Sequence, residues 1–242
     1  MKVLFCTVFI SIFTNCYSLE KADSTRKKLK AGATVSLNSN GIAPIPAFSL
    51  DEPAVIAAIS LAKGRFSYEP TLCYGLDMKP WILDSWLQYI IINRPAFEFR
   101  TGIIFSNFFS EYKLPDEVIL QGQRYFTFTF TGLYKFSPKT NLTLAYWNDR
   151  GQDKGTIQGH YINLVGDRSD IHIGKHVLLA AALQLFYINY DGYNDGLFIS
   201  PRISSSIRNV PISLFFQAIQ AIASNISPFP GFRWNVGLAY TF

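Results

Sequence analysis

The sequence predicts an all-β fold, a transmembrane antiparallel β-barrel of about twelve strands, and three observations lead to this prediction. Large apolar or aromatic residues occupy every even position from Phe232 to Phe242, while the odd positions are polar or small, so this strand has one apolar face. The same alternation recurs along most of the chain. Beyond residue 18, no apolar run approaches the ~20 residues that a membrane-spanning helix needs. Such a chain can cross a membrane only as a closed barrel.

The composition is consistent with one exported β domain. The chain has 242 residues and is 16% aromatic, with 21 Phe and 13 Tyr. This abundance is typical of barrels that carry aromatic girdles at the two membrane interfaces. The formal net charge is +5 and, apart from a basic run between Lys21 and Lys30, the charges are scattered. A small, dispersed charge of this kind does not indicate nucleic-acid binding.

Three segments are predicted along the chain, namely a signal peptide at 1–18, a flexible periplasmic lead-in at 19–28 and the barrel at 29–242. The first has a short charged start, an apolar stretch and small residues at its end, and we place its cleavage site after Ser18. A lipoprotein site at Cys16 is an alternative, but the residues before it make a poor lipobox. After cleavage only Cys73 remains, which excludes an internal disulfide.

The first six predicted strands alternate between apolar and polar residues. They span 29–38, 54–62, 65–77, 81–91, 96–106 and 123–136. The clearest is the last, in which three Phe residues alternate with three Thr residues between Phe126 and Thr131. Pro70 lies on the outward side of its strand, where it removes a ladder hydrogen bond or marks a bulge.

The last six predicted strands include the least regular ones. They span 141–149, 156–173, 176–190, 197–208, 212–223 and 232–242. The segment 156–173 is either one bulged strand or two shorter ones, because its parity breaks near residues 162–164. By composition, 177–188 and 212–222 could be buried helices. Abundant β-branched and aromatic residues, together with missing helix caps, favour strands.

The predicted connections alternate between tight turns and longer loops. Tight turns fall at 63–64, 93–95, 137–140, 174–175 and 209–211. Transmembrane barrels have short periplasmic turns and longer external loops, and only the short connection at 78–80 departs from this rule. The segment 107–122 is predicted to be a second large loop. The first loop, 39–53, is too apolar to extend into water, so we expect it to fold into the barrel mouth or to dock on a partner.

The sequence does not indicate catalysis or a cofactor. The histidines are His160, His172 and His176, and no serine lies in a nucleophile-elbow context. No cluster has metal-ligand spacing, and no phosphate-binding or dinucleotide motif occurs. We therefore expect no metal and no cofactor, and we interpret the histidines as ordinary rim or lumen residues.

Charged residues on the inward face are the candidate functional residues. They are Glu69, Asp84, Glu98, Arg100, Arg202, Arg208 and Arg233, together with Asp77, Lys30 and Arg65 on the same parity. Acids fall mainly on the third to fifth predicted strands, and bases on the first, tenth and twelfth, so a transverse field could orient solutes in a constriction. We expect Arg65 to pair with Glu69 and Arg100 with Glu98. The alternative is a salt-bridge network that closes the lumen.

The C-terminal strand resembles the terminal signature of Gram-negative outer-membrane barrels, which have an aromatic last residue and apolar residues at every second position before it. The stretch from Pro46 to Trp81 resembles uncharacterised outer-membrane proteins of Bacteroidota-type bacteria. These resemblances imply a bacterial outer-membrane location, contact with outer-membrane lipid and recognition by the barrel-assembly machinery through Phe242.

The function that the sequence favours is a narrow channel for small polar solutes. A non-catalytic surface scaffold or adhesion barrel is the main alternative. An outer-membrane lipid hydrolase, which this chain resembles only in architecture, is the third reading. A secreted soluble β protein is a further alternative of a different class.

Overall fold

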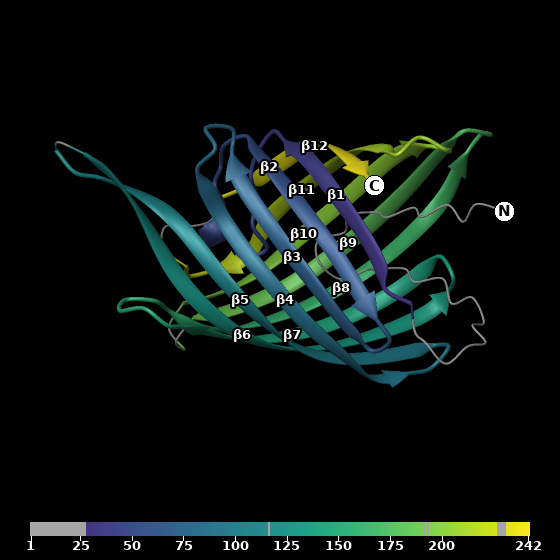
Figure 1. Cartoon of the computed structure of the whole chain (residues 1–242), viewed down its shortest axis with the longest axis horizontal. Helices are drawn as coiled ribbons and strands as arrows, with labels where there is room; N and C mark the ends of the chain where they lie inside the picture. The colour runs from purple at the N-terminus through teal and green to yellow at the C-terminus, as the bar shows by residue number, and fades with distance from the viewer. Residues whose placement is uncertain (1–27, 116, 191, 193, 227–230) are drawn as a thin grey trace.

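The structure is a computed structural model that describes residues 28–115, 117–190, 192, 194–226 and 231–242 (Figure 1). The predicted signal peptide, and the lead-in except for its last residue, lie outside the described residues. The described chain forms twelve strands and one short 3-10 helix, η1 (Pro46–Phe48). The strands are β1 (Lys30–Asn38), β2 (Ala54–Lys63), β3 (Phe66–Gly75), β4 (Pro80–Asn93), β5 (Phe97–Lys113), β6 (Val118–Ser137), β7 (Thr140–Gly151), β8 (Gln158–Ile173), β9 (Val177–Tyr190), β10 (Asn194–Ile207), β11 (Ile212–Ser224) and β12 (Arg233–Thr241).

The strands form a closed antiparallel barrel, as the sequence predicts. Every strand pairs with its chain neighbours, and β1 pairs with β12, with Thr34 opposite Thr241 and Asn38 opposite Gly237. Within the barrel wall, closure gives every strand a partner on both sides. We call the end with the tight turns and Phe242 the turn end, and the opposite end, which carries the 39–53 connection, the loop end. No helix in the described ranges is long and apolar enough to span a membrane.

The prediction of a large loop at 107–122 is wrong. β5 continues to Lys113 and β6 begins at Val118, so four residues connect them, and their hairpin projects beyond the rest of the barrel (Figure 1). Phe109 lies opposite Gly122, and an ideal Cβ at this glycine would lie 3.3 Å from the Phe109 ring. Beyond the membrane both faces of a hairpin meet water, so the apolar alternation fades although the backbone ladder continues.

The irregular segment 156–173 forms one strand, β8. Its pairing with β9 shifts register between Arg168 and Ile171, and Asp170 has a positive φ of 54°. This bulge lies near the turn end. The expected parity break near residues 162–164 is wrong, because burial alternates regularly from Gln158 to Arg168. The two segments for which helices were the alternative are the strands β9 and β11.

The outer surface is apolar around the barrel. Phe128 is 47% exposed and Leu214 is 53% exposed, whereas Thr129 and Thr131 beside Phe128 face the interior and are buried. Three pairs of aromatic rings lie at the turn end. They are Phe66 with Tyr89, Tyr134 with Phe136, and Tyr240 with Phe242. An apolar belt with aromatic rings at its border is the surface of a barrel that spans a membrane.

Candidate functional site in the lumen

The connection between β1 and β2, residues 39–53, folds into the loop end of the barrel, and we call it the plug loop. Its backbone closes on itself, because the Gly41 N–H donates to the Glu52 carbonyl (2.7 Å) and the Leu50 N–H donates to the Gly41 carbonyl (2.8 Å). Ile45 is only 7% exposed although it belongs to no strand. Of the two expectations for this loop, the structure shows the one in which it enters the mouth.

Three contacts fix the plug loop to the barrel wall. The Trp81 indole Nε1 donates to the Phe48 carbonyl at 2.7 Å. The Phe48 ring stacks on Phe108, with ring centroids 4.1 Å apart. Arg233 donates from Nε and Nη2 to the two carboxylate oxygens of Asp51, at 2.7 and 2.9 Å, where Asp51 has a positive φ of 59°. The loop is therefore held by contacts with β4, β5 and β12.

A chain of aromatic rings fills the lumen beside Ile45. The ring centroids are 5.3 Å apart for Trp86 and Trp147, 4.4 Å for Trp147 and Tyr161, 5.5 Å for Tyr161 and Phe186, and 5.0 Å for Phe186 and Phe198. These residues come from β4, β7, β8, β9 and β10, and they form one apolar cluster with Ile45. Sequence reasoning placed Trp86 on the inward face but did not predict that aromatic side chains would cross the barrel.

Nearer the turn end the lumen is polar. Its lining consists of small hydroxyl and amide side chains that are buried, including Thr34, Ser36, Gln88, Thr129, Thr131, Asn141, Thr143, Asn163, Gln184, Ser200 and Ser204. Several buried lumen atoms have no hydrogen-bond partner among the described residues, namely Gln88 Nε2, Thr143 Oγ1, Asn163 Oδ1, Asp167 Oδ1 and Arg202 Nε. Polar atoms in this state are costly in a dry interior and are satisfied by water.

The predicted pair of Glu98 and Arg100 is present on β5. Arg100 Nε donates to Glu98 Oε1 at 2.9 Å, and its Nη2 also contacts that oxygen. Arg100 Nη1 donates to Gln88 Oε1 at 3.3 Å, and both charged side chains are buried. Arg65, which we expected to pair with Glu69, donates to the Ile91 carbonyl at 3.2 Å.

Arg202 on β10 is a buried lumen base, and no ion pair to it occurs within the described part of the chain. Its guanidinium carbon lies 4.1 Å from the centre of the Phe215 ring, and its Nη1 donates to Gln217 Oε1 at 3.4 Å. The ring occupies space left by Gly237, where an ideal Cβ would lie 2.1 Å from the ring tip. Three neighbouring strands therefore position this charge by a cation–π contact.

Two carboxylates lie directly under the plug loop. Asp84 on β4 and Asp149 on β7 line a cavity of about 40 Å³ together with Ala43 and Ile45. Thr127 Oγ1 donates to Asp149 Oδ1 at 2.5 Å. Sequence reasoning selected Asp84 but missed Asp149, although the alternation of predicted strand 141–149 places it on the inward face.

The other predicted residues lie at different levels of the barrel. Glu69 has the inward parity of β3, while Arg233 lies at the loop end and Arg208 follows β10 at the turn end. Arg208, His172 and His176 line a crevice of about 650 Å³ at the turn end. The predicted charges therefore do not meet in one ring.

A second inward acid that sequence reasoning missed is Asp167 on β8. Its Oδ2 accepts a hydrogen bond from Asn141 Nδ2 at 3.1 Å, and both residues are buried near the turn end. Asp167 continues the inward set of β8, and the apolar members of that set, Tyr161 and Val165, obscure the inward parity in the sequence. The acids thus extend from β3 to β8, a wider arc than the one predicted.

A mixed crevice of about 410 Å³ opens beside the plug loop at the loop end. Lys79 in the β3–β4 turn contacts Asp77 (Nζ to Oδ2, 3.2 Å) and Glu111 on β5. The Lys79 backbone N–H and ammonium hold the pKa of Asp77 below its usual range. The turn itself requires a positive φ of 65° at Met78, which lets this external connection stay short.

The three histidines do not form a catalytic set. His160 lies on the outer wall, where it contacts Tyr146 and Asn148, while His172 Nε2 lies 3.1 Å from Asp170 Oδ1 at the turn end. His176 borders the same crevice as His172. Within the described ranges, no group of three or more His, Cys, Asp or Glu residues could hold a metal ion.

Comparison with known proteins identifies the fold. No protein-family model matches the chain, and no curated protein matches it. Among solved structures, the KdgM porin in complex with disordered oligogalacturonate has a TM-score of 0.56 and 11% identity, and covers 87% of this chain and 99% of that one. An outer membrane channel from Pseudomonas putida F1 has a TM-score of 0.51 and 11% identity, and covers 93% and 99%. The chain therefore has the fold of Gram-negative outer-membrane β-barrels.

Proposed function

We propose that this protein is a narrow outer-membrane channel for small polar solutes, closed at its loop end by the plug loop. The observation that carries the proposal is the polar lining nearer the turn end, with its unpaired buried atoms. Water satisfies such atoms, and a hydrated lumen supports the passage of small polar molecules. A twelve-stranded barrel has a diameter between the filled eight-stranded barrels and the wide porins, which fits a narrow path.

The proposed constriction consists of charged residues at several levels of the lumen, with Arg208 and Arg233 at its two mouths. Its members are Glu69, Asp84, Glu98, Arg100 and Arg202. β4 and β10 are six strands apart in a ring of twelve, so Asp84 and Arg202 belong to opposite walls. Because Glu98 and Arg100 neutralise each other, Arg202 supplies the positive wall and the acids of β3, β4 and β7 supply the negative one.

Removal of the plug tests this function. We expect deletion of residues 42–49 to raise single-channel conductance in planar lipid bilayers, because the segment includes Ile45 and Phe48, which fill and anchor the mouth. A control replaces the same eight residues by Gly and Ser, which keeps the chain length and removes only the packing. A larger current through the deletion variant than through the wild type supports the channel.

The second candidate function is a plugged, non-catalytic surface scaffold. The aromatic cluster that crosses the lumen beside Ile45 favours it. Absence of current from the wild type, the deletion variant and the Gly/Ser variant, all migrating as folded barrels, would contradict the channel and leave the scaffold.

Liposome swelling defines the solute class. The KdgM porin forms a complex with oligogalacturonate, so acidic saccharides are the first solutes to compare with neutral sugars of equal size. We further propose that residues 1–18 direct export, that the barrel-assembly machinery recognises the strand ending in Phe242, and that the channel has no catalytic activity. We also propose that the protein belongs with the Bacteroidota-type outer-membrane proteins that the stretch from Pro46 to Trp81 resembles.

A further inference from the structure

The outer wall of β7 and β8 changes character near the loop end. Leu144 and Ile162 face outward and are 54% and 44% exposed, as expected for contact with lipid chains. Nearer the loop end, the same outward faces carry polar side chains, with Asn148 opposite His160 and Arg150 opposite Gln158. We call this set the outer polar patch, and it consists of Tyr146, Asn148, Arg150, Gln158 and His160.

Hydrogen bonds fix the orientation of these side chains. Arg150 Nε donates to Asn148 Oδ1 and Nη1 donates to Gln158 Oε1, both at 2.7 Å. Since a guanidinium has only donors, Asn148 presents its oxygen to Arg150 and its amide nitrogen to His160. That nitrogen lies 3.3 Å from His160 Nδ1, which the Tyr146 hydroxyl also approaches at 2.7 Å. His160 Nδ1 therefore accepts, and the ring proton is assigned to Nε2.

The groups of Arg150 and His160 that take no part in these hydrogen bonds are all donors. Arg150 has the Nη2 group and the second N–H of Nη1, and His160 has the Nε2–H. The oxygens that contact Arg150 belong to neutral amides, and Arg150 has no ion pair within the described ranges. Both side chains are exposed. The patch thus presents one uncompensated positive charge and several N–H groups, which match an anion.

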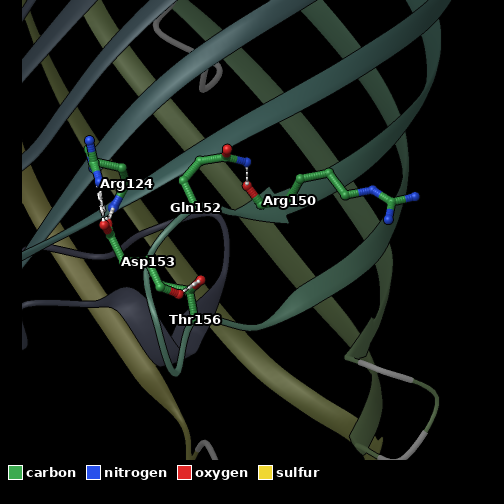
Figure 2. A network of polar contacts seen from close by, with 5 residues as sticks. All are labelled: Arg124, Arg150, Gln152, Asp153 and Thr156. Carbon is green, nitrogen blue, oxygen red and sulfur yellow. Dashed lines mark hydrogen bonds and ion pairs between the residues drawn. The ribbon is translucent and has the colours of Figure 1, made fainter.

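The charges on β6 and in the β7–β8 loop favour an anion as well, whereas Asp195, two strands from His160 on the other side, opposes it. Arg124 on β6 binds Asp153 with Nη2 to Oδ1 at 2.6 Å, so this acid is already paired (Figure 2). Gln152 donates to the Arg150 carbonyl at 2.9 Å, and Figure 2 shows the Arg150 side chain extending away from this loop network. Lys154 in the same loop is exposed and adds a further positive charge.

We propose that the outer polar patch binds the phosphate of an outer-leaflet lipid headgroup. The loop end of an outer-membrane barrel faces the cell exterior, so this patch meets the headgroups of the outer leaflet. The lipid source is favoured over free phosphate because the patch borders the apolar side chains of Leu144 and Ile162, which contact acyl chains of the same molecule. Charge attraction at a membrane surface supplies the affinity. The proposal does not depend on conduction through the lumen.

The test measures lipid binding to the purified full-length barrel in detergent by native mass spectrometry. The probes are bis-phosphorylated lipid A, its dephosphorylated form and inorganic phosphate. We expect Arg150→Gln to bind bis-phosphorylated lipid A about fivefold to tenfold more weakly than wild type, because a charge-assisted contact is lost. Arg150→Lys should fall between the two, since it keeps the charge without the planar fork. Arg94→Gln removes an exposed charge at the turn end and should bind as wild type does.

Three results would overturn the proposal. These are equal binding by wild type and Arg150→Gln, an equal loss in Arg94→Gln, and equal binding of the dephosphorylated lipid. Binding of inorganic phosphate as tight as that of lipid A, and dependent on Arg150, would show that the site serves free anions and not a lipid. Faster migration of unboiled samples on gels verifies that each variant is folded.

Discussion

At the residue scale, the lumen uses two different ways to bury an arginine. Arg100 is paired with Glu98 and hydrogen-bonded to Gln88, so its charge is compensated within the protein. Arg202 instead lies on the Phe215 ring and contacts a neutral amide, so no carboxylate of the described residues compensates its charge. Loss of either ion of a buried pair leaves the other uncompensated, so the first arrangement is structural. The uncompensated Arg202 is the better candidate for the proposed function.

Glu98→Gln should destabilise the barrel by about 3 kcal/mol, because the Arg100 charge then stays buried without a carboxylate. The free energy of unfolding is measured by urea titration in lipid vesicles with tryptophan fluorescence. Asp153→Asn, which breaks the exposed pair with Arg124, serves as the control and should change stability far less. Similar losses for the two variants would contradict the buried-pair interpretation.

At the scale of elements, the plug loop and the β5–β6 hairpin differ in where they lie. The plug loop packs its apolar side chains inside the barrel, with Ile45 in the aromatic cluster and Asp51 clamped by Arg233. The β5–β6 hairpin extends outward and is held by its own backbone ladder up to the pair of Lys113 and Val118. Sequence alone predicted a loop for both, since neither shows the alternation of a membrane strand.

Proteinase K added to intact cells should cut the chain within the four-residue connection 114–117 and spare the plug loop. The hairpin tip projects into solvent, whereas the plug loop is enclosed by β4, β5 and β12. Fragment masses from mass spectrometry locate the cleavage site. The tight turn at Lys139 provides the control, because it lies at the turn end, and cleavage there would show that the barrel has the opposite orientation.

At the scale of the whole molecule, the lumen is apolar towards the loop end and polar towards the turn end. The aromatic cluster stabilises the loop end by burial, and the β1–β12 ladder closes the wall. Closure means that unfolding cannot proceed by peeling away one edge strand, so we expect the barrel to resist detergent until it is heated.

Samples kept in sodium dodecyl sulfate without boiling should therefore migrate faster on gels than boiled samples. The compact barrel has a smaller hydrodynamic size than the extended chain, and its closed hydrogen-bonded ladder survives at room temperature. Washed envelopes should release this heat-modifiable band only with detergent. Equal mobility before and after boiling, or release into buffer, would favour the secreted soluble protein.

Much of the fold follows from local pattern. Alternation from Phe126 to Thr131 and from Phe232 to Phe242 predicts strands with an apolar outer face, and the tight turns give their order. The inward position of Asp84, Glu98 and Arg202 follows from the same period of two. Local pattern failed where both faces of a strand meet water, as in the β5–β6 hairpin, and where apolar side chains occupy the inward face, as Tyr161 and Val165 do in β8.

The period-two pattern was therefore sufficient to determine the fold class, the outward and inward faces, and the pairing of Arg100 with Glu98 on one strand. Only the tertiary structure decided that the plug loop enters the mouth, that rings from five strands meet beside Ile45, and that Arg202 rests on a ring accommodated by Gly237. The physical reason is that alternation is a property of neighbouring residues, whereas lumen packing depends on barrel closure and strand register. These bring together side chains that are far apart in the sequence.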